Sequence, residues 1–200
     1  MRNINQWILA LVLSSGGLCS CAFGGRTSAQ STENHARLDS LYWSFIESGA
    51  VKDAWIYVEA YDRSTKKSAK LFTYFIYSLL ACGEGERALS SVDSVLNKET
   101  GAFDVRELKL SVLEALNSSE GKSGLVHEVD SLYLARLEPG LSSSEPFTVY
   151  DTNELFNYIA FRIKYIGRES SFVLYEENRA RIDLEMQPHF EILLNTLDER

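Results

Sequence analysis

Two stretches of the chain, SGAVKDAWIYVEAYD at residues 48–62 and CGEGERALSSVDSVL at residues 82–96, align with each other at an offset of 34. The offset places Gly49 against Gly83. In both stretches, apolar residues recur at the spacing of a helix that buries one face, and the glycine stands just before the helix begins. A helical pattern that returns at a fixed offset predicts a repeat architecture.

The segments before these stretches repeat at the same offset. Leu38 aligns with Phe72, Leu41 with Phe75, Tyr42 with Ile76, and Phe45 with Leu79. A third copy follows at an offset of 37, because VDSVL (92–96) returns as VDSLY (129–133) and Leu79 is matched by Leu116. We therefore expect three antiparallel helix pairs over residues 34–138, each stable only when stacked on its neighbour. The alternative is an irregular helical bundle without superhelical order.

The helix pairs resemble the tetratricopeptide repeat, a 34-residue antiparallel helix pair with a small residue at its turn and an alanine early in the second helix. Gly49 and Ala54 match these positions in the first copy, and Gly83 and Ala88 match them in the second. The repeats are degenerate, because large residues stand in the middle of the first helices and Leu125 replaces the alanine in the third copy. The resemblance implies a mainly helical fold that binds peptides or proteins.

After Pro139-Gly140, short apolar runs replace the helical spacing. Strands are expected at residues 147–150, 162–166, 171–175 and 180–186, with a brief helix at 151–159 and a final helix through 190–197. The last of these strands alternates apolar and polar residues strictly, as a half-exposed strand does. The predicted fold class is therefore mainly α, with a small α+β tail over residues 139–200 that contains an antiparallel sheet.

The amino terminus has the pattern of an export signal. Arg2 precedes an apolar run, WILALVL at residues 7–13, and small residues follow. This order is typical of a secretory signal peptide. Seven helical residues span only about 10 Å, whereas a bilayer crossing needs roughly 20 residues. We therefore expect export from the cytoplasm and no transmembrane anchor in this segment.

The end of this signal, Leu18-Cys19-Ser20-Cys21, resembles the bacterial lipobox. The resemblance implies that residues 1–20 are removed and that Cys21 carries a diacylglycerol, with residues 21–33 as a flexible tether. Two or three acyl chains hold a protein firmly on a membrane. The expected location is the bacterial cell envelope, with the outer membrane favoured, facing the periplasm or the cell surface. Cleavage after Ala29 is the alternative, and it would release a soluble protein.

The sequence lacks the motifs of known catalytic sites, since no G-x-S-x-G, H-E-x-x-H, P-loop or dinucleotide-binding glycine pattern is present. A zinc site would need two ligands beyond Cys19 and Cys21, and the chain offers only Cys82 and three scattered histidines. A hydrolase that uses Cys82 is less favoured than a small apolar role for this residue. We therefore expect a protein that is not an enzyme, with no metal and no cofactor.

Charge and surface residues indicate a binding protein. The formal net charge is −8, and no basic run exists beyond Lys66-Lys67, which disfavours nucleic acid as a partner. In tetratricopeptide arrays the first helix of each pair lines a groove. The resemblance places Asp39, Trp43, Glu47, Lys70, Thr73 and Tyr77 there. Trp43 and Tyr77 would anchor a partner, unless they pack into the core.

The functional prediction is a non-catalytic, lipid-anchored envelope protein that binds a peptide or a protein partner or forms part of an envelope assembly. The alternative is a structural or immunity-type inhibitor protein that blocks a basic partner with an acidic surface. Such an interaction would weaken strongly with salt, because exposed charges are screened within about 10 Å at 0.1 M.

Overall fold

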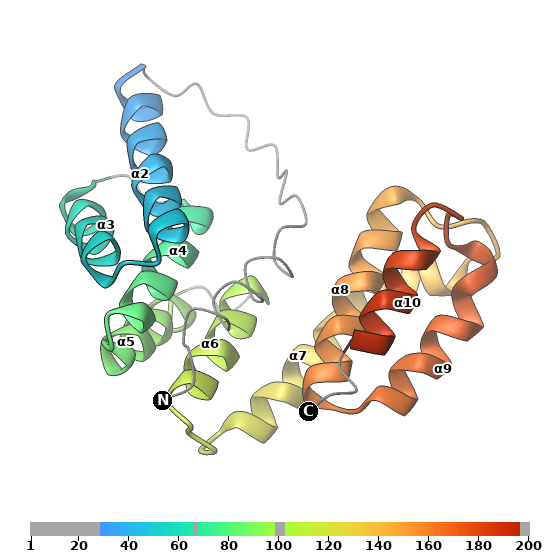
Figure 1. Cartoon of the computed structure of the whole chain (residues 1–200). Coiled ribbons are helices and arrows are strands. Elements are labelled where there is room, and N and C mark those ends of the chain that lie inside the picture. The colour runs from blue at the N-terminus through green and yellow to red at the C-terminus, as the bar shows by residue number, and fades with distance from the viewer. Residues whose placement is uncertain (1–28, 66–67, 99–102, 197–200) are drawn as a thin grey trace. The chain divides into compact units, whose positions relative to one another are not determined.

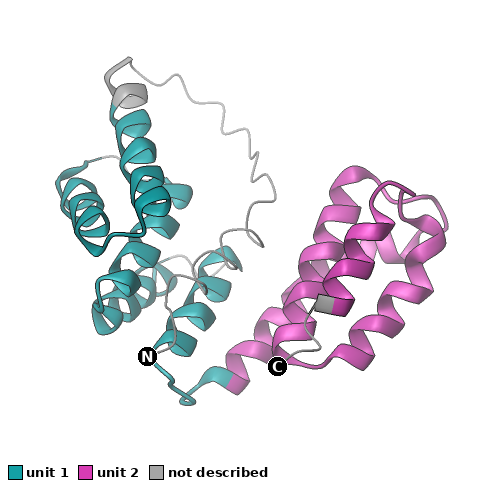
Figure 2. Cartoon of the chain, in the orientation of Figure 1, with its two compact units in different colours: residues 1–122 teal, residues 123–200 magenta. Residues whose placement is uncertain are grey.

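The computed structural model describes residues 29–65, 68–98 and 103–196, and helices account for most of them (Figure 1). The chain divides into two compact units, residues 1–122 and 123–200 (Figure 2). The expected signal peptide, Cys21 and the tether up to residue 28 lie outside the described residues. The rest of the expected tether, residues 29–33, forms the start of the first described helix. Within the described ranges, no helix is long and apolar enough to cross a membrane.

The first unit consists of helices that pack in sequential pairs. They are α2 (Ala29–Ser48), α3 (Val51–Arg63), α4 (Ala69–Ala81), α5 (Gly85–Leu96) and α6 (Phe103–Ala115). Each helix packs against the next along the chain, and α4 also contacts both α2 and α6. The first two predicted pairs, α2 with α3 and α4 with α5, are thus confirmed, and their arrangement is compatible with a tetratricopeptide-like fold.

Helix boundaries in this unit repeat at the predicted interval. The start of α3 at Val51 and that of α5 at Gly85 are separated by the same offset of 34 as the aligned sequences. This interval also separates α4 (Ala69–Ala81) from α6 (Phe103–Ala115) at both ends. The helices therefore repeat in their positions along the chain as well as in their residues.

The residues that follow the ends of α2, α4 and α6 repeat a left-handed conformation at the same interval. Gly49, Gly83 and Asn117 have positive φ angles of 61°, 79° and 52°. After Asn117, the backbone N–H of Ser118 donates to the carbonyl of Leu113 at 2.9 Å, and an equivalent bond follows Gly83. A left-handed residue at this position ends a helix and satisfies its last carbonyls, and asparagine tolerates the conformation better than most residues.

These turns correct the alignment of the third copy. The sequence alignment pairs Leu79 with Leu116, but the turn geometry places Leu113 at the position of Leu79. The second helix of this copy, α7, begins at Lys122, five residues after its turn residue, whereas α5 begins two residues after its own. Three extra loop residues therefore explain why VDSLY (129–133) returns at an offset of 37 while α6 keeps the offset of 34.

Tyrosines fill the core of the first unit. Tyr42 and Tyr57 are almost completely buried, and the ring of Tyr42 stacks on that of Tyr74 with 3.7 Å between centroids. The hydroxyl of Tyr57 donates to the carbonyl of Leu71 at 2.9 Å and so joins α3 to α4. The hydroxyl of Tyr42 is buried and has no hydrogen-bond partner among the described residues. These two similar tyrosines therefore contribute differently to stability.

The second unit is also helical. It contains α7 (Lys122–Ser142), α8 (Val149–Tyr165), α9 (Arg168–Asn178), a short 3₁₀ segment (Arg179–Arg181) and α10 (Gln187–Thr196). The described part of the chain contains no strand, so the antiparallel sheet predicted for residues 139–200 is wrong. The final helix is confirmed as α10.

Two of the predicted strands lie at the ends of α8. The helix begins at Val149 because Thr148 caps it, accepting a hydrogen bond from the backbone of Asp151 while the Asp151 carboxylate accepts one from the backbone of Thr148. The brief helix expected at 151–159 therefore extends in both directions, and it absorbs most of the segments expected as strands at 147–150 and 162–166.

Exposed apolar residues account for the other two strand predictions. In residues 171–175, Ser171 and Tyr175 are buried one helical turn apart, while Phe172 and Val173 between them are exposed. In residues 180–186, the alternation does not mark a buried face, because Leu184 is 80% exposed. Short apolar runs resemble strands when some of their members lie on a helix surface or in a loop.

One arginine ties the segments of the second unit together. Helix α7 continues through Pro139, and the Arg181 guanidinium donates to its final carbonyls, those of Gly140 and Leu141. The same guanidinium lies 4.0 Å from the centroid of the Phe147 ring. Arginine suits this position because its planar group offers several donors and can stack on an aromatic ring at the same time. It therefore holds the end of α7 beside the start of α8.

We expect Tyr57→Phe to lower the free energy of unfolding of the first unit by about 1–2 kcal/mol, because the change removes a buried hydrogen bond. Tyr42→Phe is the matched control. It should leave stability unchanged or raise it, because it removes a buried hydroxyl that lacks a partner. Urea unfolding followed by circular dichroism measures both effects, and equal losses in the two variants would contradict this account.

Candidate functional site

The outer side of α2 carries three of the predicted binding residues. Asp39, Trp43 and Glu47 follow one another at intervals of four residues and therefore lie along one side of the helix. Trp43 is 45% exposed, and Glu47 is exposed as well. The indole touches its neighbour Tyr42 edge-on, with 6.2 Å between ring centroids. A large aromatic side chain is thus displayed between two carboxylates.

Asp39 is joined to the next first helix by an ion pair. The ammonium of Lys70 lies 3.1 Å from Asp39 Oδ1 and 5.4 Å from the centroid of the Tyr74 ring. Partial burial alone would lower the pKa of Lys70, but the hydrogen bond and charge of Asp39 outweigh it, so this pKa is raised. The Lys70 ammonium is therefore charged at neutral pH. Because the side chains are 57% and 35% exposed, water screens their attraction, and the pair contributes at most about 1 kcal/mol to stability.

Tyr77 lies between α4 and α6 rather than on an open surface. Only 8% of its surface is exposed. Burial raises its pKa to about 12, the charge of Glu107 acts in the same direction, and a hydrogen bond with Ser111 opposes them. The structure therefore places Tyr77 in the packed layer, where it joins two first helices, and not beside Trp43 as a second exposed anchor.

Two other predicted binding residues, Glu47 and Thr73, differ in the polar groups that they present to solvent. Glu47 presents an exposed carboxylate, as described above. Thr73 is partly buried, and its hydroxyl donates to the carbonyl of Ala69 at 3.2 Å in its own helix. Thr73 therefore contributes shape to the surface more than hydrogen-bonding capacity.

Helix α6 adds residues that the sequence prediction did not include. The offset of 34 carries Lys70 to Asp104, Thr73 to Glu107, and Tyr77 to Ser111. The proximity of Tyr77 to Glu107 and Ser111 shows that this side of α6 adjoins the same side of α4. Extending the repeat by one more step would have found these residues.

We call this surface the acidic face. It is defined by Asp39, Trp43 and Glu47 on α2, Lys70 and Thr73 on α4, and Asp104, Glu107 and Ser111 on α6. Four of these side chains are carboxylates and one is an ammonium. The formal charge of this set of side chains is therefore negative.

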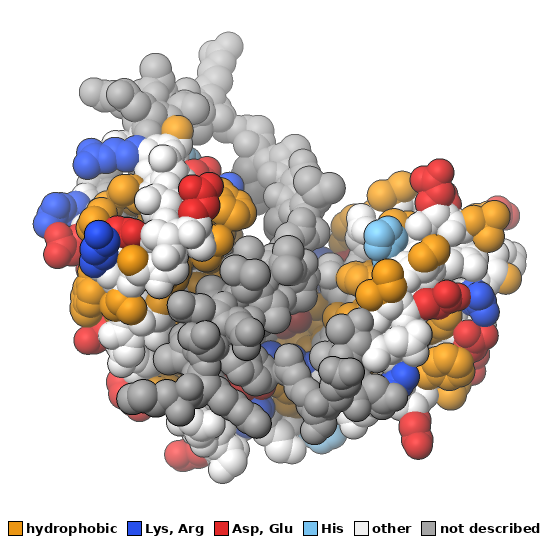
Figure 3. All heavy atoms as spheres, viewed as in Figure 1, with side chains coloured by type: hydrophobic (Ala, Val, Ile, Leu, Met, Phe, Trp, Pro, Cys, Tyr) orange, Lys and Arg blue, Asp and Glu red, His pale blue; other side chains and the backbone are white. Residues whose placement is uncertain are grey.

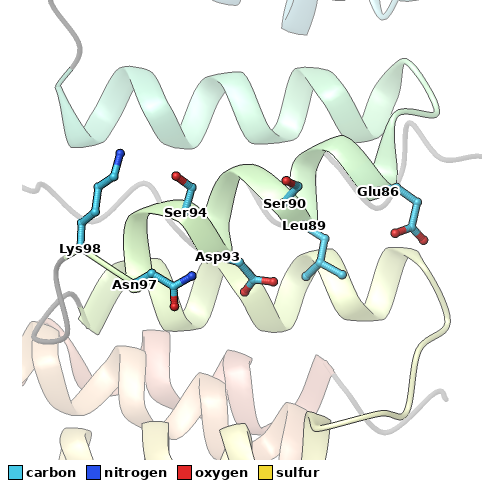
Figure 4. A pocket seen from close by; sticks show the side chains of 7 residues that line it. All are labelled: Glu86, Leu89, Ser90, Asp93, Ser94, Asn97 and Lys98. Atoms are coloured by element: carbon cyan, nitrogen blue, oxygen red, sulfur yellow. The ribbon is translucent and has the colours of Figure 1, made fainter.

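A hollow of about 530 Å³ lies along α5, outside the acidic face. Figure 4 shows the side chains that line it: Glu86, Leu89, Ser90, Asp93, Ser94, Asn97 and Lys98. They come from α5 and from the two residues that follow it, and they point to two sides of the helix rather than toward a common centre. Asp93 is also engaged by Lys109 at 2.7 Å. The hollow is an open helix surface, and its described residues do not converge on a ligand.

A second hollow, of about 260 Å³, lies in the second unit around Arg181 and Phe147. Its charged groups already serve the fold, since Arg181 holds the end of α7 and Asp151 belongs to the cap of α8. Among the described residues, no group of three or more His, Cys, Asp or Glu side chains is arranged to hold a metal ion.

Apolar side chains are also exposed on the second unit. Val149 and Leu184 are each 80% exposed, and Tyr150 is 62% exposed. Figure 3 shows apolar, acidic and basic side chains intermixed on the visible side of both units. The hydroxyl of Tyr150 is already engaged within this unit, because it accepts a hydrogen bond from Arg136 and donates one to Glu154.

No protein-family model, no curated protein and no solved structure matches this chain.

The thiol of Cys82 should react slowly in the folded protein. Burial first, and the charge of Glu84 second, raise its pKa to about 11 from the usual 9.0. The thiolate is the reactive form, so its labelling at pH 8 should be about 100-fold slower than that of an unperturbed thiol. The rate should rise about tenfold per pH unit up to that pKa and increase on unfolding.

A thiol-specific reagent measures this rate in a variant with Cys19→Ser and Cys21→Ser, in which Cys82 is the remaining cysteine. Fast labelling of the folded variant at pH 8 would reveal an activated thiolate and would revive the hydrolase alternative.

Proposed function

We propose that this chain is a non-catalytic, lipid-anchored protein of the bacterial cell envelope whose acidic face binds a peptide or a protein partner. The observation that carries the proposal is the position of Trp43. Its indole is 45% exposed on α2, although the adjacent Tyr42 is almost completely buried in the core. Tryptophan is among the residues most enriched at the energetic centres of interfaces.

The surroundings of Trp43 also favour a binding role. The core of the first unit contains other aromatic side chains, and Trp43 lies outside it with its ring edge-on to that of Tyr42. Exposing a large indole leaves apolar area that a partner can bury, at roughly 25 cal/mol per Å² removed from water. Adjacent helix axes lie about 8–10 Å apart, so the face across α2, α4 and α6 is about 20 Å wide.

The anchor is supported by the sequence alone. Leu18-Cys19-Ser20-Cys21 has a small residue directly before the second cysteine and a leucine three residues before it. The resemblance of this stretch to a lipobox favours attachment through Cys21 over cleavage after Ala29. An attached lipid would hold the helical units at a membrane surface, where the acidic face could engage other envelope proteins.

The lipid can be tested by expressing the full chain in a Gram-negative host. We expect the membrane-bound product to begin at Cys21 and to carry two or three acyl chains, as measured by mass spectrometry of its first peptide. Cys21→Ser should abolish the lipid, while Cys19→Ser should retain it. An unmodified amino terminus after Ala29 would refute the anchor and leave the binding face to be tested separately.

The binding face can be tested by site-specific photo-crosslinking in envelope preparations. We expect a photoreactive amino acid at position 43 or 47 to yield a discrete covalent adduct, because both positions lie on the acidic face. The matched controls are positions 56 and 59, which are exposed on α3 and lie outside this face. They should yield no such adduct. Identical adduct patterns at all four positions would contradict a specific role for the acidic face.

A further inference from the structure

We propose that the acidic face recognises an extended segment of a partner protein through a lysine or arginine, whose cationic group lies against the Trp43 ring and the Glu47 carboxylate. This inference rests on the proposed function and specifies the chemistry of the partner. It follows from the charge of the face, from the open ring of Trp43 and from the width of the surface.

The negative charge of the acidic face favours a partner of positive charge. Asp39 is engaged by Lys70, and Asp104 and Glu107 also have interactions within the protein. Glu47 remains exposed on the other side of Trp43. A basic segment would meet a complementary potential, whereas an acidic or phosphorylated segment would meet like charges. The net charge of −8 adds a long-range attraction for a basic partner.

Trp43 and Glu47 together have the composition of a site for one cation. Side chains four residues apart on a helix are neighbours, with about 5–6 Å between their Cβ atoms. An indole face attracts a lysine or arginine head, and a carboxylate one turn away can pair with the same head. Among the described residues, no cation lies over the Trp43 ring, whereas Lys70 lies over Tyr74 and Arg87 over Phe75. The tryptophan ring is thus open to a cation from outside.

The width of the face sets the length of the segment. A distance of about 20 Å corresponds to six or seven residues of extended chain at about 3.3 Å per residue. A segment that starts at Trp43 and crosses α4 would reach α6 near Glu107, where it meets further negative charge. Recognition would therefore combine one anchored cation with a weaker preference for basic residues farther along the segment.

The test uses an array of seven-residue peptides with blocked ends, in which each position is varied in turn, incubated with the purified full-length protein. We expect lysine and arginine to be enriched at one position. The best peptide is then titrated in solution by fluorescence anisotropy. Trp43→Ala should weaken its binding about fivefold, and Glu47→Gln about threefold. Trp55→Ala and Glu59→Gln, on α3, should change the affinity less than twofold.

Three results would overturn the inference. Enrichment of acidic, phosphorylated or aliphatic residues, with binding still lost in Trp43→Ala, would refute the cation but leave the acidic face as the binding surface. Equal binding of basic peptides by Trp43→Ala and Trp55→Ala would indicate attraction by net charge alone, and would also remove the face from the proposed function. No peptide selected, while position 43 still forms its crosslink, would show that the partner is not an extended segment. Circular dichroism verifies that each variant is folded.

Discussion

At the carboxyl end of α4, one glycine adopts a left-handed backbone conformation, and the chain turns back into α5 within a few residues. The same left-handed conformation occurs at Gly49 and at Asn117, one repeat interval to either side. At Gly49 and Gly83 the short turn places the two helices of a pair, α2 with α3 and α4 with α5, antiparallel and in contact. The small residues Ala54 and Ala88, both fully buried, allow close packing early in each second helix. The pairing, the stacking and the surface they create all follow from this local geometry.

The stacking explains why equivalent positions behave differently in successive copies. Trp43 and Tyr77 occupy the same position in consecutive repeats, yet the first is half exposed and the second is buried. The difference arises because α4 has first helices on both sides, α2 and α6, whereas among the described helices α2 has such a neighbour on one side only. A repeat at the edge of the array therefore displays an aromatic side chain that an inner repeat buries.

The sequence was sufficient to predict the helix pairs of the first unit, because glycine and alanine recur where turns and close contacts require them. It did not reveal the third turn, since Asn117 replaces glycine there and three loop residues shift the next helix. The sheet was predicted wrongly because outward-facing Phe172 and Val173 lengthened an apolar run that belongs to a helix. Of the candidate binding residues, Trp43 is surface-exposed and Tyr77 is not. The periodicity of a sequence indicates which side of a helix is apolar. It does not indicate how completely a neighbouring helix covers the residues that border that side.

The arginine of the second unit has a consequence for the order of folding. Arg181 bonds to the carbonyl of Gly140, 41 residues earlier in the chain, whereas Asp39 and Lys70 in the first unit are 31 residues apart and sit on consecutive stacked pairs. Stacked pairs can form one after another as the chain lengthens. The end of α7 can instead be secured only after residue 181 has joined the chain. The first unit can thus be fully folded before the Arg181 side chain is present to bond to the end of α7.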